Sequence, residues 1–224
     1  MLGSISSITW EQFQISMQKL IGHYTSKSFH EELTQAKKEF FDNAGTLDEN
    51  KPHYNLRMHQ FYEWYFLTRP LKSYMKTPLE VCSLHRELRL NPEDELAIEI
   101  LKQHRHSVFE FLKLKKDDIY LKDLFKNDKI VVRQNQLIFG FDEKEYFEAR
   151  LVKLGDSFYF LKSFCFHPES AQKFIANEVK VHRKNTDLNP ETFILRLNKM
   201  RYKFEQYKHV KPELIYTNDN RLGL

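Results

Sequence analysis

The chain has 224 residues, of which 41% are hydrophobic and 29% charged, a balance that excludes both a disordered chain and a membrane-embedded one. Its six glycines are few, and it contains no G-x-G-x-x-G, Walker, G-x-S-x-G, H-E-x-x-H or paired C-x-x-C pattern. The common dehydrogenase, hydrolase and zinc families are therefore not expected. The 19 Phe and 11 Tyr residues predict a core rich in aromatic rings.

The first seven residues carry no basic group and no long apolar run, so we expect no secretory signal peptide. No stretch of about 18 apolar residues, the length that spans a bilayer, occurs anywhere in the chain. Cys82 and Cys165 lie far apart in the sequence and form a disulfide only if the fold brings them together. We interpret them as reduced cysteines of a cytoplasmic protein.

Residues 1–105 are predicted to form a helical region. Helix starts are indicated by capping boxes at Thr9, Ser28 and Thr77, and by a further Asn-Pro start at Asn91. A third helix carries apolar residues on several sides and must end before Pro70. We expect this third helix to lie at the centre of the helical region.

Residues 106–167 are predicted to form a small antiparallel sheet, because Phe, Tyr, Val and Ile alternate there at a period of two. We expect strands over 107–114, 129–133, 136–141, 145–154 and 157–166. A two-residue turn at Gly155-Asp156 would place Leu154 opposite Ser157 and Leu151 near Phe160. One face of this hairpin is apolar, whereas the other carries the polar residues Tyr146, Glu148, Arg150, Tyr159, Ser163, Cys165 and His167.

The helical period returns over 168–210, where a last helix begins at Asn189 and is expected to pack on the sheet. Residues 211–224 show little periodicity and are predicted to form an extended or loose tail. The order of helices, small sheet and helices indicates an α+β fold.

The polar face of the hairpin holds the candidate ligand-binding residues Glu148, Arg150, Cys165 and His167. Cys165 and His167 are two residues apart on one face, as a nucleophile and its base would be, although a buried cysteine beside a turn histidine explains them as well. Arg150 either binds an anionic ligand or pairs with an acid such as Glu148. His104 and His106 offer two imidazoles, but a polar loop accounts for them, and we expect no metal and no cofactor.

Basic residues gather near the C-terminus. From residue 180 to 211 there are nine basic and three acidic residues, a net charge of +6, which leaves −2 for the rest of a chain whose net charge is +4. Arg196, Lys199 and Lys203 fall on one face of the last helix, opposite its apolar stripe. Such a face can contact phosphates or an acidic protein, or can simply be solvated.

Six short segments carry a resemblance to a family. Glu63-Trp64-Tyr65-Phe66-Leu67-Thr68-Arg69-Pro70-Leu71 and Thr77-Pro78-Leu79-Glu80 resemble the E-W-F-L-F-D-R-P-L and T-P-L-E segments of an uncharacterised family of bacterial proteins, with Thr68 in place of the usual acid. Residues 107–110, 123–125, 149–151 and 164–168 are similar to later segments of that family. The resemblance covers about residues 55–180. Some relatives carry a cysteine-rich SEC-C zinc motif that this chain lacks. The resemblance implies an architecture and a bacterial, cytoplasmic setting, and no activity.

Two hypotheses follow for the function. The first is a non-enzymatic binding or regulatory module whose basic C-terminal helices contact an acidic protein or nucleic acid. The alternative is an enzyme or small-anion-binding protein that uses the face of Glu148, Arg150, Cys165 and His167. The absence of familiar catalytic motifs and the asymmetric charge favour the first hypothesis.

Overall fold

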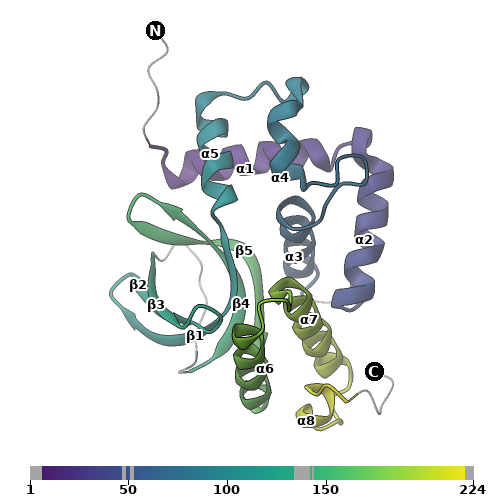
Figure 1. Ribbon diagram of the computed structural model, residues 1–224, viewed down its shortest axis with the longest axis vertical. Helices are drawn as coiled ribbons and strands as arrows, with labels where there is room; N and C mark the ends of the chain where they lie inside the picture. The colour runs from purple at the N-terminus through teal and green to yellow at the C-terminus, as the bar shows by residue number, and fades with distance from the viewer. Residues whose placement is uncertain (1–6, 47–48, 51–52, 134–141, 143, 220–224) are drawn as a thin grey trace.

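The computed structural model describes residues 7–46, 49–50, 53–133, 142 and 144–219, and it confirms an α+β architecture of helices arranged around a β-barrel (Figure 1). The helices are α1 (Trp10–Tyr24), α2 (His30–Ala44), α3 (Tyr54–Leu67), α4 (Pro78–Val81), α5 (Pro92–Lys102), α6 (Gln172–Lys184), α7 (Pro190–Gln206) and α8 (Pro212–Ile215). Short 3₁₀ turns are η1 (Lys27–Phe29), η2 (Cys82–Leu84), η3 (Arg86–Leu88) and η4 (Glu169–Ala171).

The strands close into a barrel in the order β1-β2-β3-β5-β4, with β4 returning to β1. They are β1 (Arg105–Lys115), β2 (Asp118–Asp123), β3 (Asp128–Arg133), β4 (Tyr146–Leu154) and β5 (Ser157–His167). Neighbouring strands are antiparallel except β3 and β5, which meet in parallel at Val132 and Phe158. β2 was not predicted from the sequence, and the strand expected over 136–141 lies outside the described residues.

The predicted hairpin of β4 and β5 is confirmed, with Leu154 opposite Ser157 and Leu151 opposite Phe160. Beyond Leu151 the register shifts, so that Ala149 pairs with Phe164. Three β5 residues, 161–163, therefore stand against one β4 residue, Arg150. This bulge frees backbone N–H groups that must find other partners.

The helix starts follow the predicted capping chemistry with one exception. Thr9, Thr77 and Asn91 each form a full capping box with the residue three positions later. The prediction at Ser28 was wrong, because Ser28 lies inside η1 and α2 begins at His30 without a side-chain cap. A preceding 3₁₀ turn already orders this segment, so α2 continues from a turn rather than starting from an extended residue.

Helix α3 lies at the centre of the helical region, as predicted. Phe61 is 1% exposed, Trp64 is 6% exposed and Phe66 is fully buried, although they point to different sides of the helix. Two polar residues of the same helix, Gln60 and Glu63, are also buried and face β5. A helix apolar on several sides must be enclosed, and α1, α2, α4 and β5 enclose this one.

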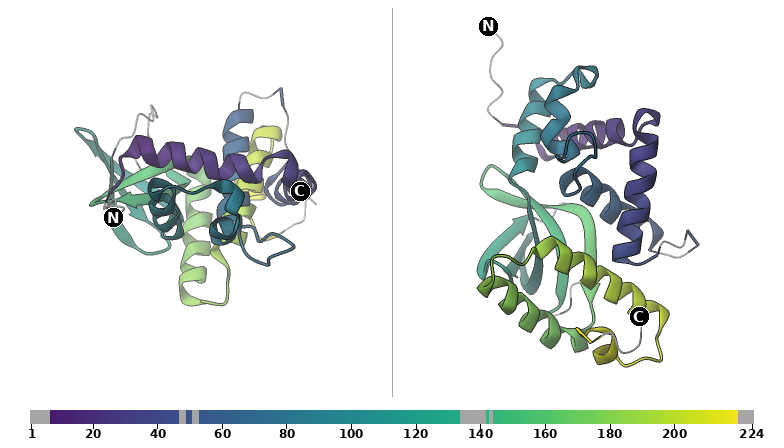
Figure 2. Two further views of the ribbon diagram at one scale, coloured as in Figure 1. Left: turned by 90° about the horizontal axis from the view of Figure 1, so that it is seen from above. Right: turned by 45° about the vertical axis from the view of Figure 1, so that its right-hand side comes forward.

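The C-terminal helices α6 and α7 lie across the barrel at the end remote from α1 and α5 (Figures 1 and 2). Their apolar residues form a cluster with Val108 of β1. The expectation of an extended or loose tail is wrong for the described residues 211–219, because α8 ends at Ile215, and Ile215 and the following Tyr216, which are 5% and 3% exposed, join this cluster. Burial of two large apolar side chains orders a segment that has no periodicity of its own.

Among the described residues, none of the helices combines the length and the apolar character that a membrane span requires.

The barrel interior predicts the cost of a core substitution. Phe160 is 1% exposed and its ring lies 5.0 Å from that of Phe164. Phe160→Ala should lower the free energy of unfolding by about 3–5 kcal/mol, because it leaves a cavity in the barrel. Leu114→Ala, at a side chain 55% exposed on β1, is the control and should change little. Urea denaturation followed by circular dichroism measures both, and equal effects would contradict the assignment of Phe160 to the core.

Candidate functional site

The four candidate residues of the hairpin lie together but beneath other elements. Glu148 and Arg150 of β4, and Cys165 and His167 of β5, are between 1% and 6% exposed. Glu148 and Cys165 are direct partners across the two strands. Helices α3 and α7 pack against β5, and α5 packs against β4, on this outer face of the barrel. The predicted polar face is therefore a buried layer between the barrel and the helices.

Arg150 is the centre of this layer. Its guanidinium donates to Thr68 Oγ1 at 3.0 Å and lies 3.1 Å from His104 Nε2. It also lies 3.5 Å from a carboxylate oxygen of Glu191 and 4.0 Å from one of Glu63. These partners come from α3 and its C-terminal cap, from the residue before β1 and from the first turn of α7, so one cation connects three separate segments. A buried guanidinium requires such a set of acceptors.

His106 forms the second cationic centre of the layer. Its Nε2 lies 2.7 Å from Glu148 Oε1, and its Nδ1 lies 2.8 Å from Glu191. Burial and Arg150 oppose a charge on this imidazole, but the two carboxylates outweigh them and raise the pKa of His106. Burial likewise works against charge on Glu148 and Glu191, yet the neighbouring cations hold the pKa of each carboxyl below its usual range. His106 and Arg150 therefore balance the charges of Glu148 and Glu191.

Glu63 ties α3 to the bulge of β5. Its Oε1 accepts the backbone N–H groups of Lys162 and Ser163 at 2.7 and 3.0 Å. These are N–H groups that the bulge removes from the strand ladder. Burial raises the pKa of Glu63 to about 7, although Arg150 and the two backbone donors act against the rise. Gln60, one helical turn earlier, donates to the carbonyl of Phe164 at 2.6 Å and completes the attachment.

Cys165 and His167 do not form an activated pair. His167 Nδ1 lies 3.2 Å from the hydroxyl of Tyr216, which belongs to the C-terminal segment. Burial lowers the pKa of His167 to about 4, while burial and then the charge of Glu148 raise the pKa of the Cys165 thiol. A catalytic cysteine needs the opposite shift, towards a thiolate. Both cysteines of the chain are buried and free.

His104 and His106 are likewise engaged by protein groups. The side chain of His104 also contacts the carbonyl of Leu101 at 2.8 Å, and burial lowers its pKa to about 4. His104 therefore contacts Arg150, and His106 contacts the carboxylates of Glu148 and Glu191. Sequence analysis identified Arg150, Glu148 and both histidines, but it missed Glu63, Thr68 and Glu191, because no spacing links these residues to the hairpin.

The basic residues of α7 are less exposed than predicted. The Arg196 side chain is 42% exposed and pairs with Glu178 of α6 at 2.9 Å. Lys199 donates to the backbone carbonyl of Asp42, near the C-terminal end of α2, at 3.1 Å. Lys203 is half-buried, and burial followed by the charge of Lys199 lowers its pKa. The first two residues also line a hollow of about 590 Å³ with Glu178, His182 and Asp187.

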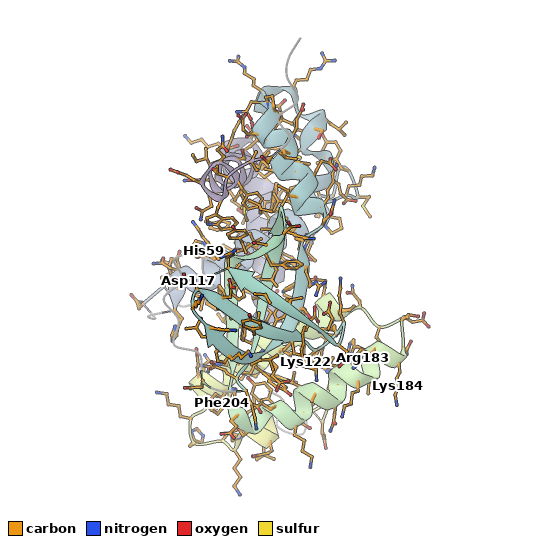
Figure 3. All side chains as sticks on the ribbon, turned by 90° about the vertical axis from the view of Figure 1, so that its left-hand side faces the viewer. His59, Asp117, Lys122, Arg183, Lys184 and Phe204 are labelled. Carbon is orange, nitrogen blue, oxygen red and sulfur yellow. The ribbon has the colours of Figure 1, made fainter. Side chains whose placement is uncertain are left out.

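A more exposed basic surface lies on the barrel itself, on the outer side of β1, β2 and β3. We call it the open barrel face. The strand pairings arrange its side chains in three rows, which are Glu110, Lys122 and Lys129; Lys113, Tyr120 and Val131; and Lys115, Asp118 and Arg133. Five of these nine residues are basic and two are acidic. Figure 3 looks onto this face and shows Lys122 on the same side as Arg183 and Lys184 of α6.

An aromatic ring lies at the centre of the open barrel face. The Lys113 ammonium lies 5.0 Å from the centroid of the Tyr120 ring, within cation–π range. Val131, the partner of Tyr120 on β3, is 41% exposed. The rings of Phe125, after β2, and His182, on α6, lie 6.0 Å apart, which places the basic end of α6 at the edge of the face.

A family model described as a family of unknown function, DUF7986, matches residues 26–208, and the chain belongs to that family. No curated protein matches the chain. No solved structure matches it either.

The buried layer predicts a specific pH dependence. A carboxyl whose pKa rises to about 7 on folding keeps a proton that the unfolded chain releases above its ordinary pKa of about 4.5. Its contribution to stability is therefore present at low pH and is lost as the pH rises towards and past 7. Between pH 5 and 8, the stability of the wild type relative to Glu63→Gln should fall by about 2–3 kcal/mol.

Chemical denaturation of both proteins across this pH range gives the difference. The difference, rather than the wild-type curve alone, is informative, because His104 and His167 have lowered pKa values and titrate with the opposite sign. Glu169→Gln, at an exposed residue, is the control for removal of a carboxyl group and should change the stability little. A difference for Glu63→Gln that does not vary with pH would show that Glu63 is ionised throughout.

Proposed function

We propose that this member of a family of unknown function is a binding module without catalytic activity, and that it binds single-stranded nucleic acid on the open barrel face. The observation that carries the proposal is the row arrangement of Lys113, Lys122, Lys129 and Arg133 around the half-buried ring of Tyr120. Lysine and arginine neutralise phosphates, and an aromatic ring stacks on bases of any sequence. A surface that combines both suits a single strand, whose bases are free to stack.

The topology supports the same surface. The barrel has the strand order of the OB-fold, a five-stranded barrel that binds oligonucleotides through its second and third strands and the adjoining loops. Here β2 and β3 carry the open barrel face, and the loop between β1 and β2 adds the exposed Lys116. This support is an analogy of fold, and the residues of the face carry the proposal.

The stripe of Arg196, Lys199 and Lys203 is the second surface on which an acidic partner can be proposed. Two of its three basic side chains already have partners within the protein, because Arg196 pairs with Glu178 and Lys199 donates to the end of α2. The open barrel face offers five basic side chains against the three of the stripe, and among the five Arg133 pairs with Asp118 at 3.7 Å. We therefore place the principal contact on the barrel and treat α7 as the alternative.

Catalysis or small-anion binding by the buried layer has less support. Arg150 is 1% exposed and already faces Thr68, Glu191 and Glu63. The environment of Cys165 disfavours its thiolate. A bacterial, cytoplasmic setting, which the family resemblance implies, stays a prediction.

Fluorescence anisotropy with labelled single- and double-stranded oligonucleotides at low salt tests the proposal. The single strand should bind more tightly, with a log–log salt slope of about −0.7 for each phosphate contact. Lys122→Glu with Lys129→Glu should weaken binding and make that slope shallower by about 1.4, since two contacts are lost. Tyr120→Ala should weaken binding by about 1–3 kcal/mol through lost stacking.

The matched control is Lys72→Glu with Lys76→Glu, which changes the net charge equally at exposed residues between α3 and α4, away from the barrel face (Figure 1). This variant should bind nearly as the wild type does. If both double variants weaken binding equally, the interaction depends only on the net charge of the protein. If no oligonucleotide binds at micromolar concentration in low salt, the nucleic-acid proposal is wrong.

The α7 stripe generates a separate prediction. Changing Arg196, Lys199 and Lys203 together to Glu should lower the thermal midpoint, because a carboxylate at position 196 would face Glu178 and the contact of Lys199 with α2 would be lost. The folded variant should keep its affinity for the single strand. Loss of binding in this variant, with retention in the Lys122 and Lys129 variant, would place the contact on α7 instead.

A further inference from the structure

Three side chains outside the buried layer converge at the far end of the helical region. His23 lies in the last turn of α1, His85 lies between η2 and η3, and Glu87 lies within η3. The chain segments that carry His23 and His85 are 62 residues apart in sequence. Their ligand-type atoms all lie within 4.8 Å of one another, the one such group of three found among the residues that the structure describes.

The distances within this group match one face of a metal tetrahedron. His23 Nε2 lies 3.3 Å from His85 Nδ1 and 3.8 Å from Glu87 Oε1, and His85 Nδ1 lies 3.4 Å from the same oxygen. Zinc binds imidazole nitrogen and carboxylate oxygen at about 2.0–2.2 Å, so tetrahedral geometry separates its ligands by about 3.3–3.6 Å. Two of the three edges fall within that range and the third exceeds it slightly. The separations of the three ligand atoms therefore suit binding to a single zinc ion.

We propose that His23, His85 and Glu87 bind a Zn²⁺ ion and leave its fourth coordination position open. Two imidazoles and one glutamate are a ligand set that proteins use for zinc with an open position. This site is independent of the open barrel face and of its proposed nucleic-acid ligand.

Aromatic rings pack around both imidazoles and restrict their orientation. The ring of His85 is stacked on Phe29 with centroids 5.8 Å apart, and it lies 5.4 Å from the ring of Tyr24 and 5.5 Å from that of Tyr74. The ring of His23 contacts Tyr24 and Phe29 from the other side.

An ion can reach this site from the side of Glu87. Its side chain is 63% exposed, whereas those of His23 and His85 are 16% and 8% exposed. An ion can therefore enter from the solvent side, where the carboxylate is free to turn. His85 also lines a hollow of about 570 Å³ with Phe29, His30, Glu31 and Tyr74, so the site lies beside a space that can admit a small molecule.

One feature limits the expected affinity. In a complex through Nδ1, the proton of His85 sits on Nε2, and this buried atom has no hydrogen-bond partner among the described residues. Metal-binding imidazoles normally donate that proton to a carbonyl or carboxylate, and loss of such a partner costs about 10–100-fold in affinity. We therefore expect binding in the micromolar range rather than the nanomolar range of fully supported zinc sites.

A titration of the full chain with ZnCl₂ tests the site, after treatment with a chelator and in competition with a chromophoric zinc indicator. We expect one Zn²⁺ per chain and a rise in the thermal midpoint on saturation. Co²⁺ in place of Zn²⁺ should give the visible absorption bands of a tetrahedral site. His23→Gln, His85→Gln and Glu87→Gln should each lower zinc affinity at least about tenfold, since even the loss of a group that only orients a ligand has that effect.

The control is His209→Gln, which removes an exposed imidazole elsewhere and should leave the affinity unchanged. Glu87 is exposed, so Glu87→Gln should fold as the wild type does and keeps the test valid if a histidine variant is unstable. Unchanged affinity in Glu87→Gln and His23→Gln, or no stoichiometric binding at micromolar zinc, would overturn the proposal. The three residues would then be a hydrogen-bonded cluster only.

Discussion

The burial of Arg150 is the constraint on which the arrangement of this molecule depends. A guanidinium that is 1% exposed cannot be left without acceptors, because an unpaired buried charge costs several kcal/mol. Its acceptors lie on α3, after α5 and on α7. Displacing any of these segments leaves the cation with fewer partners. The layer therefore specifies how the helices sit on the barrel, whereas the three apolar clusters supply most of the burial.

The bulge in β5 and the buried Glu63 supply each other's hydrogen-bond partners. A bulge removes N–H groups from a strand ladder, and a buried carboxylate needs donors. Glu63 accepts the N–H groups of Lys162 and Ser163, so each defect satisfies the other. The alternation of β5 keeps its phase across this point, because the bulge inserts two residues. Its inward side chains, Phe160 and Phe164, still face the barrel interior on both sides of the bulge.

Local signals in the sequence predicted much of the fold. The capping residues Thr9, Thr77 and Asn91 and the turn at Gly155 act over three or four residues, so they can be read directly. The strand β2 was missed because only three of its six residues are apolar or aromatic, and charged residues stand at both of its ends. The bulge leaves no mark in the alternation that a pattern analysis can detect. Closure into a barrel depends on pairing between distant strands, which periodicity does not reveal.

For the candidate sites too, the residues that share a face could be predicted from the sequence, whereas the contacts between distant segments could not. Alternation placed Glu148, Arg150, Cys165 and His167 on one face, but it could not show that helices cover that face. Helical spacing placed Arg196, Lys199 and Lys203 together, but it could not show the contacts of Arg196 with α6 and of Lys199 with α2. The convergence of His23 with His85 depends on a turn between two helices, and no short motif encodes it.

The closing contact of the barrel has a consequence for the behaviour of the protein at high concentration. Among the residues that the structure describes, β3 and β5 meet through one parallel pair, Val132 and Phe158, whereas the other neighbouring strands share long antiparallel ladders. Parting of this short seam gives β3 and β5 free edges with unpaired backbone groups. Such edges template pairing with another chain. The charged side chains of Lys129 and Arg133 on β3 then disfavour aggregation, because like charges repel when two such edges approach.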